Sequence, residues 1–252
     1  MTDPDHQIGA GANGPRRIGI DGCRGGWVWC GRLDGRWQGG VRASLAQWPE
    51  LDALDLALID MPIGLVEHGT DERRCDREAR ALLGRPRASS VFRPPCRAAL
   101  EAADYHEACV LNRARTGVAL SRQTWGITPK IRELDRLLRG RAGLRWRLRE
   151  AHPELCLWGL AGGRPMRHPK RTRQGRAERL ALLGALEPDC IALLETLMGA
   201  HPRRAVAADD IIDALVLGVS AGRLLRGRVG RVPGDLELDA ARLPMQLLLA
   251  LG

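Results

Sequence analysis

The feature that most constrains this chain is an apolar segment that ends in an aspartate and a run of glycines. Residues 17–29 read Arg-Ile-Gly-Ile-Asp-Gly-Cys-Arg-Gly-Gly-Trp-Val-Trp. The pattern predicts a strand up to Ile20, a glycine turn, and a second strand that starts at Trp27. Asp21 would then be held at one edge of a sheet, where a metal-dependent phosphoryl-transfer site needs its first ligand. Asp and Gly also favour plain turns, and this segment alone favours that simpler interpretation.

The next segments extend the pattern into a sheet. Asp34-Gly35 is typical of a hairpin turn between strands at 27–33 and 36–43. Ser44 is expected to cap a short helix that ends near Leu54. The apolar run 56–59 suits a buried parallel strand and is followed directly by Asp60. Three antiparallel strands, a helix and a parallel strand form the opening half of an α/β ribonuclease H-like fold, so we expect a mixed five-stranded sheet flanked by helices.

The rest of the chain is predicted to be mostly helical. A helical insertion is expected at about 66–141, between the fourth and fifth strands, with helices at 71–84, 96–115 and 128–140. A strand is expected at 144–148, followed by helices at 176–186, 188–198 and 208–225. Residues 1–16 read as a flexible tail and 17–252 as a single domain. The last 25 residues show no clear pattern.

Charge and cysteine content narrow the class of protein. The formal net charge of +9 suits a polyanionic partner such as nucleic acid, although only two of the 39 basic residues are lysine, which also fits a coding bias toward arginine. The seven cysteines include no pair with C-x-x-C spacing, so neither a zinc site nor a disulfide framework is indicated. Reduced thiols fit a cytoplasmic protein. No stretch approaches the ~20 apolar residues that span a bilayer.

Carboxylates late in the chain change the interpretation of Asp21. The predicted last helix begins Ala-Asp-Asp-Ile-Ile-Asp, so Asp210 and Asp213 lie on one helical face, and the pair Asp209 and Asp213, four residues apart, is also possible. Asp213 is placed among apolar residues, where an unpaired carboxylate is costly, so we expect a positive group opposite it. With Asp60, these residues follow the order of a ribonuclease H-like acidic site. Mg²⁺ or Mn²⁺ would relieve the repulsion, and two ions about 4 Å apart could activate water and stabilise the leaving oxygen of a phosphodiester.

At this point the chain resembles a known family, the "domain of unknown function 429", whose members are predicted nucleases with a ribonuclease H-like fold. The resemblance spans about residues 17–225. The segments that carry it are Ile-Asp-Gly-Cys-Arg-Gly-Gly-Trp-Val (20–28), Ile-Asp-Met-Pro-Ile-Gly-Leu (59–65), Arg-Arg-Cys-Asp-Arg-Glu-Ala-Arg (73–80), Ser-Val-Phe-Arg-Pro-Pro (90–95), Pro-Lys-Ile-Arg-Glu-Leu-Asp (129–135), His-Pro-Glu-Leu (152–155) and Asp-Asp-Ile-Ile-Asp-Ala-Leu (209–215).

The chain is also similar, more distantly, to Holliday-junction resolvases of the RuvC type. These enzymes carry an Asp on the first strand, an acidic residue on the fourth, and D-x-x-D-A-L on the last helix. The resemblance implies four metal ligands, namely Asp21, Asp60, Asp210 and Asp213. Asp60 stands where the resolvases use Glu, a change that shortens the reach of that ligand.

Several other residues are weaker candidates. Glu154 and Lys130 are second choices for the site, the first as a carboxylate and the second as a cation that neutralises a phosphate. Arg93 could act like Lys130, and a solvated surface position is as common for both. His152 could shuttle protons, but a structural or exposed role is the more common one for a histidine. The basic loop at 164–176 could follow a nucleic-acid backbone.

The sequence therefore predicts a Mg²⁺- or Mn²⁺-dependent nuclease that hydrolyses phosphodiester bonds in DNA or RNA by a two-metal mechanism. Asp21 would bridge both ions, Asp60 would hold one, and Asp210 with Asp213 the other. Two alternatives stay open: a non-catalytic nucleic-acid-binding or regulatory protein, and an actin-like or sugar-kinase-type protein, for which the chain lacks a second copy of the motif. A membrane partner is not expected, and a homodimer is left open.

Overall fold

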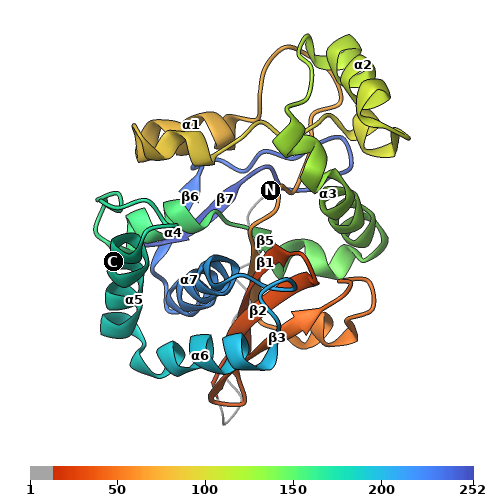
Figure 1. Ribbon diagram of the computed structural model, residues 1–252. Helices are drawn as coiled ribbons and strands as arrows, with labels where there is room; N and C mark the ends of the chain where they lie inside the picture. The colour runs from red at the N-terminus through yellow and green to blue at the C-terminus, as the bar shows by residue number, and fades with distance from the viewer. Residues whose placement is uncertain (1–13) are drawn as a thin grey trace.

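A mixed five-stranded sheet forms the centre of the computed structural model, which describes residues 14–252; the first 13 residues of the expected tail lie outside the described part. The strand order is β3-β2-β1-β4-β5 (Figure 1). The strands are β1 (Arg17–Cys23), β2 (Gly26–Leu33), β3 (Arg36–Arg42), β4 (Leu56–Ile59) and β5 (Leu148–Glu150). The first three are antiparallel neighbours, whereas β1, β4 and β5 run parallel. The predicted ribonuclease H-like fold, including β1 beside β4, is confirmed.

The two faces of the sheet follow from the two-residue period of strands. Ile18 and Ile20 of β1 are fully buried on one face, against α3 (Arg122–Gly140) and its neighbours. Gly19 points to the other face, which α7 (Ala208–Leu224) covers. The same alternation places Asp21 on the face of α7, because it lies two residues beyond Gly19.

Two glycines, which have no side chain, let α7 lie very close to β1. A Cβ atom at Gly19 would lie 2.2 Å from the carbonyl oxygen of Ala214 and 2.4 Å from the backbone nitrogen of Gly218. A Cβ atom at Gly218 would lie 2.5 Å from the carbonyl oxygen of Cys30. Both positions therefore require glycine, and the resulting contact fixes the height of α7 over the strands.

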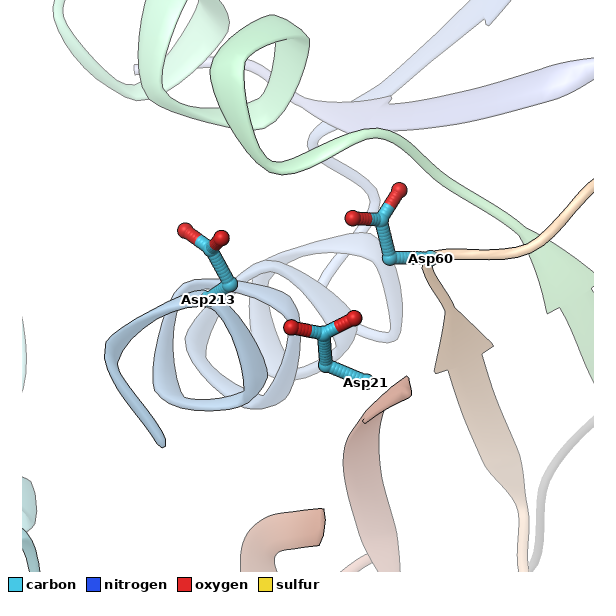
Figure 2. Close-up of side chains that lie close together, drawn as sticks. All are labelled: Asp21, Asp60 and Asp213. Carbon is cyan, nitrogen blue, oxygen red and sulfur yellow. The ribbon is translucent and has the colours of Figure 1, made fainter. Parts of the chain in front are cut away.

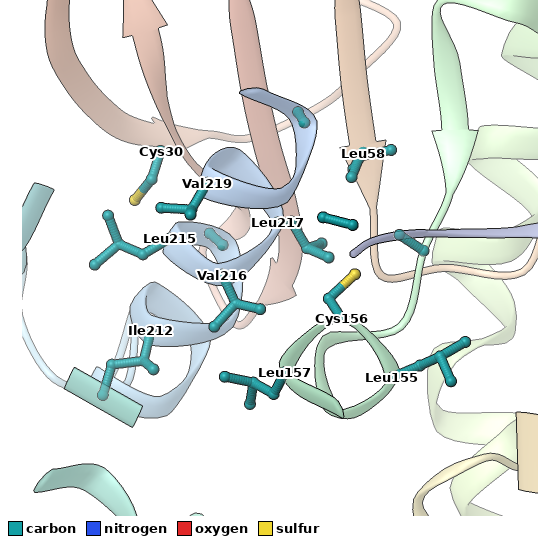
Figure 3. Packing of buried hydrophobic residues seen from close by; sticks show 14 of the residues in the cluster. Cys30, Leu58, Leu155, Cys156, Leu157, Ile212, Leu215, Val216, Leu217 and Val219 are labelled. Carbon is teal, nitrogen blue, oxygen red and sulfur yellow. The ribbon is translucent and has the colours of Figure 1, made fainter. Parts of the chain in front are cut away.

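Three further helices pack around α7 in the same layer. They are α4 (Pro153–Leu160), α5 (Arg173–Leu186) and α6 (Ile191–Ala200). Figure 3 shows the part of the core that lies between α4, α7 and the sheet, in which Leu157 and Cys156 of α4 meet Val216 and Leu217 of α7. This large apolar cluster anchors the helix that carries Asp213.

The predicted helical insertion lies between β4 and β5 and contains α1 (Arg74–Leu83), α2 (Tyr105–Thr116) and α3. Figure 1 shows α1 and α2 beyond the end of the sheet at which β1 finishes. Arg97 ties the insertion to the rest of the protein, because its guanidinium pairs with Asp135 of α3 and with Asp239 near the C-terminus. Asp239 also accepts hydrogen bonds from the backbone of Leu65 and Leu243.

Several predicted helix boundaries are wrong. The helix expected at 96–115 is broken into a 3-10 turn at Arg97–Glu101 and α2, because the Asp104 side chain caps α2 by accepting from the Glu107 backbone. Helix α3 starts at Arg122, not near Thr128, since Ser121 caps it and Pro129 lies inside. The helix expected at 71–84 begins at Arg74.

Other local expectations also need correction. The segment after Ser44 forms only a 3-10 turn at Pro49–Ala53, because Pro49 disfavours helical backbone at Trp48. The Ser44 hydroxyl accepts from the Ala46 N–H and donates to Glu133, but no helix follows it. The strand expected at 144–148 is instead β5 at Leu148–Glu150, and the preceding residues form a 3-10 turn at Ala142–Trp146. The last residues, which gave no pattern, form a two-stranded sheet of β6 (Val229–Val232) and β7 (Leu247–Ala250).

Two predictions about the chain as a whole can be compared with the structure. All seven cysteines lie in the described part and are free thiols, as expected, and six of them are buried. Within residues 14–252, no helix has the length and apolar character needed to cross a membrane.

Candidate metal centre

Three carboxylates meet where β1, β4 and α7 come together. Asp21 lies in β1, Asp60 directly follows β4, and Asp213 lies in the second turn of α7. One oxygen from each lies within 4.8 Å of the others. Figure 2 shows the three carboxyl groups facing a common space above the end of the sheet. We call these residues the acidic triad.

Strand pairing brings the first two members together. Ile20 is opposite Ile59 in the parallel β1–β4 pair, and the Asp60 backbone N–H donates to the Ile20 carbonyl over 3.0 Å. The next residue on each strand is therefore an aspartate facing α7. Asp21 Oδ1 also accepts from the Gly22 N–H at 2.6 Å, which fixes the carboxyl group near the end of β1.

Burial and mutual repulsion make it unfavourable for all three carboxylates of the triad to carry a charge. Burial raises the pKa of Asp21 well above its usual range, and the neighbouring charges of Asp60 and Asp213 raise it further. The pKa of Asp60 is raised mainly by burial. The pKa of Asp213 rises to about 6 for the same main reason, although Lys170 opposes the shift. Hard divalent cations bind carboxylate oxygens and relieve this repulsion, so the donor set fits Mg²⁺ or Mn²⁺.

Lys170 supplies the positive group that the sequence led us to expect near Asp213. Its Nζ atom lies 2.8 Å from Asp213 Oδ2. The sequence predicts Lys170 only as one cation of the basic loop at 164–176. It is one of two lysines in an arginine-rich chain, but nothing in the sequence indicates that the loop folds back onto α7.

Glu154, a second-choice candidate, lies in the first turn of α4 and pairs with the fully buried Arg179 of α5. Its other oxygen, Oε2, is buried without a hydrogen-bond partner. Glu154 lines a cavity together with Asp60 and Asp213, and its charge raises the pKa of both. Arg179 also donates to the carbonyl of His168, so this ion pair holds the loop that carries Lys170.

The structure places Asp210 and Lys130 beside the triad but not in it. Asp210 Oδ2 accepts from the Ala207 N–H at 3.0 Å, at the start of α7. Its charge still raises the pKa of Asp21. The Lys130 ammonium group donates to the Gly26 carbonyl and lies 4.5 Å from the centre of the Trp27 ring. The roles of Asp210, Glu154 and Lys130 stay predictions.

The two weaker candidates differ in position. The His152 ring lines the same cavity as Asp60, its Nε2 lies 3.2 Å from the Ser90 carbonyl, and its Nδ1 is buried without a partner. Arg93 instead donates to the backbone carbonyls of Thr70 and Asp71, on the exposed side of the insertion.

A buried network of ion pairs lies beside the site, and the sequence did not predict a functional role for it. Arg73 pairs with Asp76 of α1 and with Glu150 at the end of β5. Arg73 also donates to the carbonyl of Ile63, and Glu150 accepts from the Ile63 N–H at 2.7 Å. The network therefore fixes the loop that follows Asp60. Arg73 belongs to a segment of the family resemblance, which was the only signal available.

The sheet order, the covering helix and the buried carboxylates define a ribonuclease H-like α/β protein with an acidic centre suited to a metal ion. The model of one family, described as "Protein of unknown function (DUF429)", matches residues 19–238, and the chain belongs to that family. No curated protein and no solved structure gives a match.

Proposed function

We propose that this protein is a Mg²⁺- or Mn²⁺-dependent nuclease that hydrolyses phosphodiester bonds in nucleic acid. The observation that carries the proposal is the meeting of Asp21, Asp60 and Asp213 where the ends of two parallel strands meet one helix. Buried carboxylates with raised pKa values are typical of functional sites. Bound divalent ions would supply activation of water and stabilisation of the negative charge that develops at the phosphate.

The residues of the chain would have distinct tasks in this reaction. Asp21 would be the central metal ligand. Asp60 and Asp213 would bind the metal on either side of it. Asp210 would complete the ligand set after a change of side-chain conformation away from the Ala207 N–H. Lys170 and Lys130 would attract and orient the phosphate, since both ammonium groups lie beside the triad.

The test is an incubation of purified protein with DNA and RNA in single-stranded, duplex and branched forms, in Mn²⁺ or in EDTA. We expect cleavage in Mn²⁺ alone. Asp21→Asn should abolish cleavage and keep the fold, because it removes a ligand charge and almost no volume. If no substrate is cut, while wild type and Asp21→Asn bind nucleic acid equally well without metal, the non-catalytic alternative is supported instead.

A further inference from the structure

A basic groove lies beside the acidic triad, along the β1–β2 turn. It encloses about 930 Å³ between this turn, α3 and the loop that precedes α7. We call it the turn groove. A backbone hydrogen bond of 2.8 Å from the Gly25 N–H to the Ala205 carbonyl joins the turn to the loop. This contact brings Arg24 and Arg203, which are far apart in the sequence, into the same groove.

The cations of the turn groove are available to a ligand. Arg24, Arg171 and Arg203 are exposed, and within residues 14–252 none of them forms an ion pair. The half-buried Lys130 adds a fourth cation to the lining. An arginine fork without a carboxylate partner is suited to bind phosphate oxygens.

The acidic residues of the turn groove are already engaged. Glu133 accepts from the Trp27 ring nitrogen at 2.9 Å and from the Leu45 N–H at 2.6 Å. Asp210 accepts from the Ala207 N–H. Four cations therefore face two anions in the lining, and both anions have donors of their own. The net charge favours an anionic ligand.

A second groove borders the triad itself. It encloses about 520 Å³, and Asp60 and Asp213 form part of its wall. Arg87, Arg171 and Lys170, which pairs with Asp213, also line it. Arg171 lines both grooves, so the two meet at the basic loop. Asp60 and Asp213 thus border the second groove, and the turn groove begins at Gly22, the residue that follows Asp21. In the second groove three cations face three carboxylates, so its excess of positive charge would appear only when the carboxylates bind metal ions.

We propose that one nucleic-acid strand passes through both grooves, with phosphates bound on each side of the scissile bond, so that the protein cuts internal phosphodiesters. This inference rests on the proposed nuclease function. Hydrolysis forms one P–O bond from water and breaks the P–O bond to a sugar oxygen, which takes up a proton. The products are two strand ends, one of which carries the phosphate, and each leaves from its own groove.

The first experiment measures binding alone. A fluorescently labelled single-stranded oligonucleotide is titrated in EDTA at several salt concentrations with wild type, Arg24→Gln, Arg203→Gln and the double variant. Arg36→Gln is the control, because Arg36 begins β3 at the end of the sheet opposite the triad. We expect the double variant to bind roughly tenfold or more weakly, with a salt slope lower by about one to one and a half, as for two lost phosphate contacts. Equal binding and an equal slope would overturn the groove assignment.

The second experiment tests internal cleavage with circular and linear single strands of DNA and of RNA in Mn²⁺. We expect the circle of the preferred nucleic acid to be cut. Shortening of linear strands from their ends, with circles intact, would overturn the inference but keep the nuclease function. If neither form is cut, internal cleavage of a single strand fails. The proposed function fails with it only if the duplex and branched substrates are also left intact, and the binding experiment decides separately whether the turn groove holds a strand.

Discussion

The Lys170 ammonium group lies 2.8 Å from Asp213 Oδ2, at the edge of the acidic triad. The Asp213 side chain is almost completely buried, whereas that of Lys170 is 45% exposed. An exposed cation on a loop therefore neutralises a buried anion on a helix. A divalent ion bound to Asp213 would compete with the Lys170 ammonium group for the carboxylate oxygens of Asp213. The ion pair therefore couples metal binding to the position of the basic loop.

Replacing Lys170 by Met should strengthen metal binding. The variant removes a cation that repels the incoming ion and occupies Asp213, so we expect the Mn²⁺ affinity to rise roughly three- to tenfold in the absence of nucleic acid. Isothermal titration calorimetry gives the value directly. Lys130→Met is the control, since it removes a nearby cation whose ammonium group donates to the Gly26 carbonyl and to no triad carboxylate. An affinity that falls, or changes equally in both variants, would contradict the competition.

Asp21→Asn should remove the stabilisation that metal gives to the fold. For wild type, Mn²⁺ at 100 times its dissociation constant should add about 2.7 kcal/mol, or several degrees in Tm. The variant should melt at the same temperature with Mn²⁺ and with EDTA, and in EDTA it should melt slightly higher than wild type, because one repelling charge is gone. Asp34→Asn, an exposed change of the same kind, should behave as wild type. A metal-induced shift that survives in Asp21→Asn would rule out the triad as the site.

The members of the triad could be predicted because periodic structure determines their direction. A strand alternates its side chains, so Asp21 and Asp60 follow from the apolar residues that precede them. In α7 the sequence predicted Asp213 through its three-residue spacing from Asp210 and its position among apolar residues, although every residue from Ile211 to Gly222 is buried and the helix has no single apolar stripe.

The partners of the triad could not be predicted, because they depend on how loops and helices pack. Lys170 reaches Asp213 across 43 residues and Arg179 reaches Glu154 across 25. Among 39 basic residues, no local pattern distinguishes these two. The start of α3 was missed for a related reason. Pro129 is typical of a first helical turn, but here the Ser121 cap and tertiary packing place it inside the helix.

The stability of the metal-free protein should depend on pH through Asp213. Its pKa is about 6 in the folded state, against an ordinary value of 3.8. The folded state therefore holds more protons than the unfolded state between these values, and this carboxyl group lowers stability as pH rises from about 4 to above 6. The unfolding free energy of Asp213→Asn, taken relative to that of wild type, should increase by on the order of 2 kcal/mol from pH 4.5 to pH 7.5. Urea unfolding in EDTA gives the difference, and Asp235→Asn, at a highly exposed position, should show no such trend.

Removing only one partner of the buried pair of Arg179 and Glu154 should be strongly destabilising. Arg179→Met leaves Glu154 buried without its cation and should cost roughly 3–5 kcal/mol of unfolding free energy. Adding Glu154→Leu should recover most of that loss, because no uncompensated charge remains. Urea unfolding of the two variants checks this. A double variant as unstable as Arg179→Met would show that Arg179 acts through its bonds to the loop carbonyls instead.

The contact between Gly19 and α7 should be the most sensitive backbone feature of the site. A methyl group at Gly19 would meet backbone atoms of α7 at 2.2 and 2.4 Å, and backbone in a packed layer cannot move aside as a side chain can. Gly19→Ala should therefore cost roughly 1–3 kcal/mol or more and move Asp213 away from Asp21, which would also weaken Mn²⁺ binding. Gly199→Ala in α6 is the matched control. A Cβ atom there meets nothing within 4 Å, so the change should be neutral or stabilise the helix by up to about 1 kcal/mol. Urea unfolding and Mn²⁺ calorimetry on both variants separate the two effects. Wild-type stability and affinity in Gly19→Ala would show that α7 can shift without disturbing the triad.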